Sequence, residues 1–204
     1  MATKKGDKVK SGLKNVHYAV ISEDENGVVS YETPVKMPGA VNVSLSALFE
    51  QTNIPADDDP SYATIEENNG YEGELEILIL PDQFKIDVLG YTLDENDVLV
   101  ENKDAVSKPF ALMFEFSGDK NKMRHLLYRC KATKPNIESG TKGDSAEAKT
   151  DTLPFKATPA HDTGDIKAKA MQGDPAYDGW YQKVYTGTTQ TAQTAQTASD
   201  TEEE

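Results

Sequence analysis

The sequence is poor in features on which several classes of protein depend. Only one of its 204 residues is cysteine, only one is tryptophan, and no apolar run is long enough to cross a bilayer. The single thiol, Cys130, excludes an intrachain disulfide, and its apolar neighbours predict a buried group that packs as a small hydrophobe. The N-terminus lacks the apolar segment of a signal peptide. We therefore expect a protein that acts in solution or in a soluble particle, with no membrane partner.

Positive charge is also scarce. The chain carries 21 Lys and Arg residues against 35 Asp and Glu residues, which gives a formal net charge of -14. A field of this sign repels phosphate, so tight nucleic-acid binding is not expected, and it keeps a concentrated protein soluble. The one basic cluster lies near the start and is either a solvated arm or a docking segment for an acidic neighbour: Lys4, Lys5, Lys8, Lys10 and Lys14.

Signatures of catalysis and of metal binding are missing. The histidines, His17, His125 and His161, have no cysteine or carboxylate spacing typical of zinc, and no phosphate loop, dinucleotide fingerprint or serine elbow is present. Glu74 and Glu76 share a strand face, which favours a solvated or interfacial ladder of glutamates over a general acid pair. The sequence therefore predicts no enzyme, no cofactor and no metal site.

Three consecutive aspartates, Asp57, Asp58 and Asp59, lie in a loop between two prolines. Calcium loops usually interleave their oxygen ligands with spacer residues and close with a bidentate glutamate. This pattern favours a solvated turn or a charged lining over a calcium site. A hydrolase built on these aspartates or on Glu74 is the least favoured alternative.

The clearest positive signal is a pair of alternating runs, residues 110–116 and 124–132, separated by the turn Gly-Asp-Lys-Asn. A period of two indicates strands, and the short polar gap indicates a hairpin at the centre of the core. In this interpretation Leu126, Tyr128, Cys130 and Ala132 share one face. The predicted register pairs Phe114 with Leu126, Leu112 with Tyr128, and Glu115 with His125.

Turn signals divide the rest of the chain into further strands. One short helix is predicted at residues 81–89, with Pro81 suited to its first turn and Gly90 to its end. The other predicted elements are strands at 16–21 and 28–31 around an Asn26-Gly27 turn, strands at 41–51, 62–67 and 72–80 with a turn at 68–70, a hairpin within 91–104 with its turn at 94–97, an edge strand around Pro154, and a last strand at 166–170.

Composition predicts the domain organisation. Residues 1–12 form a flexible N-terminal arm, residues 13–185 form one β domain that contains a polar loop at 134–150, and residues 186–204 form a disordered acidic tail. The aromatic cluster Trp180, Tyr181 and Tyr185 either caps this domain or makes a subunit contact. The expected fold class is mainly β: a β-sandwich or barrel with one short flanking α-helix.

Three stretches together resemble the major tail protein family of bacterial viruses with long, non-contractile tails: GLKNVHYAVI, NNGYEGELEILILPDQFKIDVLGY and PFALMFEFSGDKNKMRHLLYRCKATKP. Their order and spacing over residues 12–160 carry the resemblance. It implies a tail-tube-protein-like fold, a homohexameric ring and rings stacked into the conduit for genome delivery. It also implies a virion tail protein made in the host cytoplasm, with the tape-measure protein inside the tube, tail terminator and baseplate or initiator proteins at its ends, and DNA only as transient cargo.

Under this resemblance, residues 41–51 and 62–67 form the hairpin that lines the lumen. The residues expected to face the lumen are Asn42, Ser44, Ser46, Asp57, Asp58 and Asp59, and the expected subunit contact is Trp180, Tyr181 and Tyr185. An acidic lumen repels DNA and so keeps it from binding to the wall. Subunits that join their sheets satisfy the backbone hydrogen-bonding groups of open strand edges. The alternative function is a carbohydrate- or protein-binding β-sandwich that uses Trp180 and its neighbouring tyrosines.

Overall fold

The protein folds mainly into β-strands, as predicted. The computed structural model describes residues 12–25, 28–119, 122–136 and 149–187, and these contain eleven strands and one short helix. The elements in chain order are β1 Leu13–Glu23, β2 Val29–Tyr31, β3 Val35–Lys36, β4 Ala40–Ala56, β5 Asp59–Ile77, α1 Asp82–Asp87, β6 Thr92–Leu93, β7 Leu99–Val100, β8 Phe110–Phe116, β9 Arg124–Ala132, β10 Asp151–Thr158 and β11 Lys167–Ala170.

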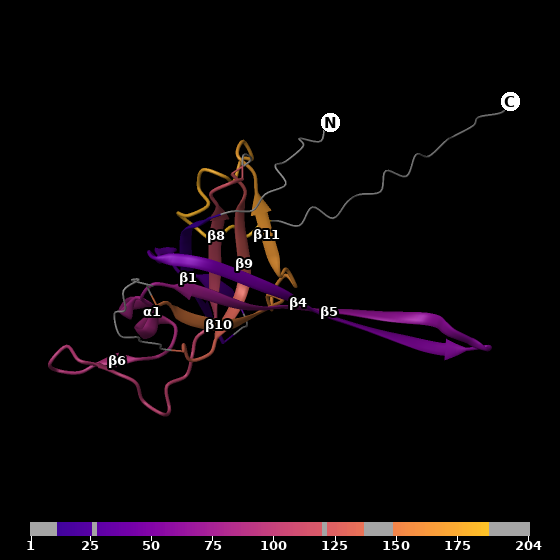
Figure 1. Cartoon of the computed structure of the whole chain (residues 1–204), viewed down its shortest axis with the longest axis horizontal. Coiled ribbons are helices and arrows are strands. Elements are labelled where there is room, and N and C mark those ends of the chain that lie inside the picture. The colour runs from indigo at the N-terminus through magenta and orange to yellow at the C-terminus, as the bar shows by residue number, and fades with distance from the viewer. Residues whose placement is uncertain (1–11, 26–27, 120–121, 137–148, 188–204) are drawn as a thin grey trace, which may run out of the picture.

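Nine strands form one antiparallel sheet in the order β2-β1-β8-β9-β10-β5-β4, with β11 added to β9 and β3 added to β1. Strand β9 changes partner along one edge, because residues 124–127 pair with β11 whereas residues 129–132 pair with β10. In Figure 1 the β8 and β9 strands run across the direction of the β4–β5 pair. The curled sheet encloses apolar side chains on both of its faces, an arrangement consistent with a β-sandwich.

One core lies between the sheet and α1, and it confirms the predicted helix. The six-residue helix is too short to be stable alone, so packing must hold it. Its Phe84 is fully buried, and its ring meets those of Tyr18 and Phe110 edge to face at 4.9 and 5.4 Å. Val88 and Leu89 continue the buried helix face, as their spacing predicts.

A second core lies on the opposite face of β1, β8 and β9. Ala111 and Met113 of β8 are fully buried there, although they alternate with the bulky side chains of the first core. The C-terminal segment covers them with Tyr177, Trp180 and Val184. Strand β8 is therefore central in the sheet and apolar on both faces, which explains its nearly continuous hydrophobic sequence.

The β8–β9 hairpin is present, but its predicted register is wrong by one residue. The observed register pairs Phe114 with His125, Glu115 with Arg124, Met113 with Leu126, and Leu112 with Leu127. Phe110 lies opposite Cys130, so a bulge in β9 accommodates one extra residue. The bulge separates Leu126 and Tyr128, in the second core, from Cys130 and Ala132, in the first. The single face predicted for these four residues is therefore also wrong.

Residues 62–67 and 72–80 are not separate strands, because β5 runs unbroken to Ile77 through the predicted turn at 68–70. Gly70 has φ +101°, and a Cβ atom there would lie 1.9 Å from the carbonyl oxygen of Ala157. This glycine allows the close approach of β10 at an irregularity in the β4–β5 register. Leu75 and Ile77 are buried as expected, whereas Ile79, after the strand, is exposed.

The predicted edge position of the strand around Pro154 is also wrong, because β10 lies between β9 and β5. Pro154 lies opposite Glu74 of β5, and its carbonyl accepts a hydrogen bond from the backbone N–H of Thr133, one residue beyond β9. The N atom and carbonyl of one residue point to the same side of a strand. The missing N–H of Pro154 therefore faces Thr133, and only the reciprocal bond of this pair, just past the end of β9, is absent.

The remaining predicted elements are found, with shifted ends. The β6–β7 hairpin turns where expected, and Asp94 accepts backbone hydrogen bonds from Asn96 and Val98 at 2.8 and 2.9 Å.

Cys130 is fully buried, as predicted, and burial raises the pKa of its thiol. The Asn26-Gly27 turn, most of the predicted N-terminal arm, polar loop and acidic tail lie outside the described residues. No helix in the described ranges is long and apolar enough to span a membrane.

Candidate functional site

Strands β4 and β5 present a polar face that is built by simple alternation. Asn42, Ser44 and Ser46 are exposed, whereas Val43 and Leu45 between them pack against the first core. The β4–β5 register places the three polar residues directly opposite glutamates of β5, in the pairs Asn42–Glu76, Ser44–Glu74 and Ser46–Glu72. We call these six residues the polar face.

The polar face is anionic. Its three glutamates follow one another at every second position, so their Cα atoms are about 7 Å apart along the strand. Glu72 and Glu74 are exposed and Glu76 is half-buried. Such a row repels phosphate and attracts cations. Within the described ranges no three His, Cys, Asp or Glu side chains are grouped closely enough to hold a metal ion.

The edge of β4 beside the polar face has no strand partner. In the described part of the chain β4 pairs only with β5, and it is the last strand of the sheet. Its 17 residues therefore offer an unpaired row of backbone N–H and C=O groups along one side. An open edge of this length is a template for a strand of another chain.

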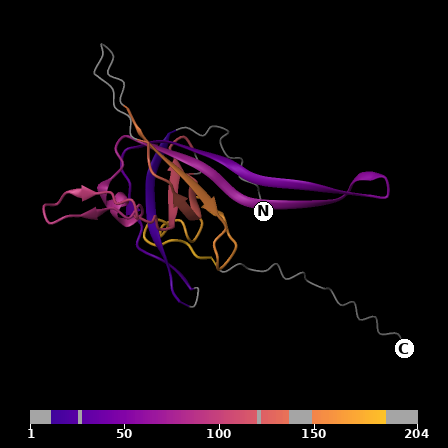
Figure 2. The ribbon, with the colours of Figure 1, turned by 90° about the horizontal axis from the view of Figure 1, so that it is seen from below.

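Beyond the body of the protein, β4 and β5 continue as a two-stranded arm, residues 49–67 (Figures 1 and 2). All its residues except Ala56 are exposed, and no other element covers them. Its exposed apolar side chains include Phe49, Ile54, Tyr62 and Ile65. An isolated two-stranded ribbon is at best marginally stable in water, so the arm is built to contact something else.

The structure does not bring together all six residues predicted to line a lumen. Asp57 and Asp58 form the two-residue turn at the tip of the arm, with φ +49° and +63°, and Asp59 pairs with Ala56 beside them. At about 3.3 Å per residue the tip lies roughly 35 Å along the strand from Ser46. The tip aspartates and the polar face are therefore two separate sites.

The C-terminal aromatic cluster closes the second core of its own chain. Trp180 is only 2% exposed, and Tyr185 stacks on it at 5.7 Å while remaining 42% exposed. Tyr181 stacks on His17 at 4.4 Å. This arrangement agrees with the capping interpretation, and a subunit contact through the cluster stays a prediction. The buried indole of Trp180 is not available to stack on a sugar, which argues against carbohydrate binding through this residue.

A buried charge network anchors that terminal segment, and sequence reasoning missed it. Glu115 is 4% exposed and is held by Lys14 Nζ at 3.0 Å and Arg124 Nε at 3.3 Å. The Arg124 guanidinium lies 3.8 Å from the centre of the Tyr177 ring and donates to the Tyr177 carbonyl. Burial, and then the Glu115 carboxylate, raise the pKa of Tyr181. The one-residue error in the β8–β9 register hid the Glu115–Arg124 pair.

Comparison with known proteins gives the family of the chain. A search of curated proteins finds no match. A family model described as phage tail tube protein matches residues 5–185, which is most of the chain. The description implies a structural role in the virion tail and self-assembly into a tube. On this match, the chain belongs to the phage tail tube protein family.

Proposed function

We propose that this chain is the subunit of a hexameric ring and that such rings stack into the tube through which a long, non-contractile tail delivers the genome. The observation that carries this proposal is the open edge of β4 beside an anionic face. A neighbouring subunit that adds a strand to this edge satisfies its backbone groups and extends the sheet. Repetition around a closed ring turns separate sheets into one continuous barrel without an edge.

The polar face is the proposed lining of the lumen. Asn42, Ser44 and Ser46 supply small, hydrated groups, and Glu72, Glu74 and Glu76 supply negative charge beside them. DNA that passes this face meets a row of like charge, in which only Glu72 has a lysine, Lys156, opposite it. The lining therefore lowers the affinity of the tube for its cargo, so DNA is a transient and non-specific partner.

A tube that conducts DNA implies further protein partners inside it and at its ends. The tape-measure protein occupies the lumen before DNA does, and terminator and baseplate or initiator proteins close the two ends of the stack. Assembly takes place in the host cytoplasm. Within the ring, the exposed side of Tyr185 offers a subunit contact, supported from beneath by Trp180, while Tyr181 braces the same segment against β1.

Electron microscopy of the purified protein over a concentration series tests this function. We expect rings with sixfold symmetry or hollow tubes at high concentration. Particles that stay monomeric up to the highest concentration, in salt that preserves intact virions, contradict it.

The proposed lining has a separate test in virions that carry variant subunits. Glu72→Lys, Glu74→Lys and Glu76→Lys combined should leave tubes intact but slow the release of DNA, because the bore then binds phosphate. A matched control makes the same charge change at the β6–β7 hairpin and in the loop after it, with Glu95→Lys, Asp97→Lys and Asp104→Lys. Equal release rates in the two triple variants contradict a lumen role for the polar face.

A further inference from the structure

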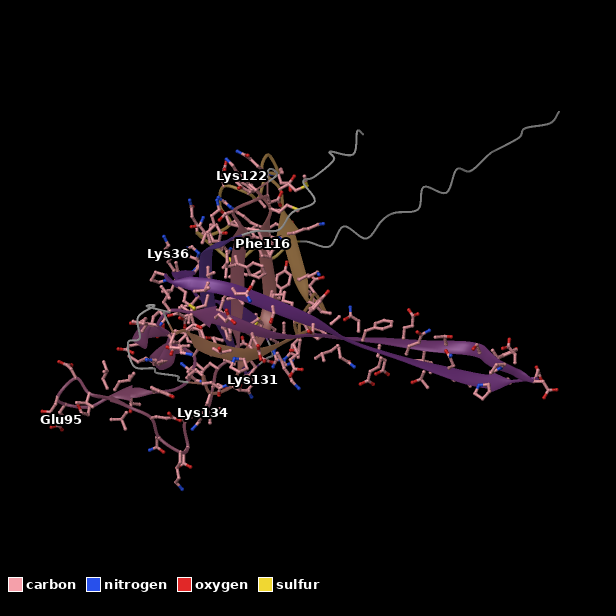
Figure 3. The ribbon with its side chains drawn as sticks, viewed as in Figure 1. Lys36, Glu95, Phe116, Lys122, Lys131 and Lys134 are labelled. Atoms are coloured by element: carbon pink, nitrogen blue, oxygen red, sulfur yellow. The ribbon has the colours of Figure 1, made fainter. Side chains whose placement is uncertain are left out.

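A cationic pocket stands out on a chain that carries a net charge of -14. It has a volume of about 440 Å³ and lies where the end of β9 meets β10 and the loops around residues 89–91 and 105–107. Four basic residues line it: Arg129, Lys131, Lys134 and Lys156. Figure 3 labels Lys131 and Lys134, which lie on the lower side of the body in that view.

The basic side chains of this pocket are poorly neutralised by the chain itself. Lys131 of β9 lies directly opposite Lys156 of β10, and like charges in that position destabilise a sheet. Within the described residues neither lysine forms an ion pair, although Glu72 faces Lys156 from β5. Arg129 donates to the neutral Thr158 hydroxyl at 3.0 Å, and only Lys134 has a carboxylate partner, Glu101. The pocket therefore has unused positive charge.

Part of the pocket lining is apolar. Leu89, Tyr91, Ala105 and Ala132 line it together with the basic residues. Such a site suits a ligand that has carboxylates next to a small apolar surface, because the lining offers both apolar and basic groups.

The tip of the arm has this chemistry. Ile54, Pro55 and Ala56 form a short apolar stretch that leads directly to Asp57 and Asp58, whose side chains are exposed. Neither aspartate has a hydrogen-bond or ion-pair partner among the described residues, whereas Asp59 accepts a bond from the backbone of Ser61. Asp57 and Asp58 thus complement the two unpaired lysines in number and sign.

A second copy of this chain fits as the partner. The arm points away from the body in both views, so its tip does not reach the pocket of its own chain (Figures 1 and 2). From Phe49 to Asp57 the arm is long enough, at roughly 25 Å, to contact an adjacent subunit. The geometry points to a docking contact in which the arm tip of one subunit, through Asp57 and Asp58, enters the Lys131–Lys156 pocket of another. This inference rests on the proposed tube and gives these aspartates a docking role in place of a lumen-facing one.

Charge reversal and restoration test the contact. Lys131→Glu with Lys156→Glu, or Asp57→Lys with Asp58→Lys, should each raise the protein concentration needed for tube formation at least about tenfold, because a like-charge contact replaces an attractive one. All four substitutions together should restore most of the loss. The matched control, Glu95→Lys with Asp97→Lys, changes the same charge at the tip of the other hairpin and should have no such effect. Unchanged thermal unfolding confirms that each variant is folded.

A cross-link gives a second measurement on assembled protein. Asp58→Cys with Lys156→Cys should form a ladder of disulfide-linked multimers, and buried Cys130 does not compete. Glu95→Cys with Lys156→Cys should form none. If tubes form normally in every charge variant, or the four-fold variant is no better than either pair, the docking contact is wrong and the proposed tube stands. If the unmodified chain forms neither rings nor tubes, both are wrong.

Discussion

The body and the arm of this protein are made from the same strands but are stabilised in different ways. In the body, β8 has six of its seven residues buried, with one core on each side. In the arm, residues 49–67, nearly every side chain is exposed, and β4 and β5 have only each other. Glu50 even lies directly opposite Glu67, a pairing of like charges that a folded core would not favour.

The difference shows which contacts each region depends on. The free energy of unfolding of the isolated subunit comes from the body, because only there is apolar surface removed from water. The arm and the open edge of β4 contribute little to that free energy, and we expect them to become fully ordered only against another subunit. Substitutions in the body should therefore change stability, and those in the arm should change assembly.

The largest expected effect contrasts two phenylalanines. Phe155→Ala removes a side chain that is 2% exposed and should lower the free energy of unfolding by about 3–5 kcal/mol. Phe49→Ala removes one that is 53% exposed and should lower it by less than about 0.5 kcal/mol while weakening assembly. Urea unfolding of the free subunits measures both. Comparable losses of stability would show that the arm shares the core of the body.

The next largest effect concerns the buried carboxylate of the body. Glu115→Gln leaves Lys14 and Arg124 without their anion and should cost about 3 kcal/mol, because breaking a buried ion pair is expensive. Asp82→Asn breaks a surface pair with Lys85 and should cost less than about 1 kcal/mol. Thermal unfolding at neutral pH compares the two. A negligible effect of Glu115→Gln would mean that the network does not anchor the C-terminal segment.

A smaller effect is expected at the junction of body and arm. Gly70→Ala combines an unfavourable φ with a collision against the carbonyl of Ala157 and should cost at least about 2 kcal/mol. Gly173→Ala has a similar φ, +102°, but nothing within 4 Å, so only the backbone cost of about 1 kcal/mol applies. Equal losses in chemical denaturation would contradict a close approach of β10 to Gly70.

The smallest effect is a pH dependence in the body. Burial lowers the pKa of His17 below its ordinary value, so the unfolded chain binds the proton more tightly than the folded one. Stability from this residue is complete above about pH 6.5 and is lost as the pH falls through the folded pKa. His17→Gln should flatten the fall in stability between pH 7 and 5. Parallel curves for wild type and His17→Gln would rule out this contribution.

Local patterns were enough to predict most of the body. The period of two located the strands, and the Pro81-to-Gly90 segment gave the helix. The β8–β9 register was not predictable from alternation, because a strand buried on both faces fits its partner in two registers equally well. The sequence predicts an edge position for Pro154 because a missing N–H is tolerated there. Inside the sheet the proline is tolerated because β9 ends beside it, so that only one bond, with Thr133, is absent.

The candidate site was predicted in part. Alternation correctly grouped Asn42, Ser44 and Ser46 on one exposed face, but Glu72 was not joined to them because their relation depends on the register of β4 and β5. The turn signal at Gly70 also divided one long strand in two, which concealed the arm and put the tip aspartates too near the polar face. Close approach of β10 at Gly70 is a tertiary contact that a turn-like sequence does not reveal.

Hydrogen exchange of backbone amides, compared between the free subunit and the assembled tube, tests the dependence of the arm on a neighbour most directly. The account predicts that amides of residues 49–67 exchange rapidly in the free subunit and become strongly protected in the tube, while those of β8 are protected in both. Arm amides that are already protected in the free subunit, or that stay unprotected in assembled tubes, would contradict it.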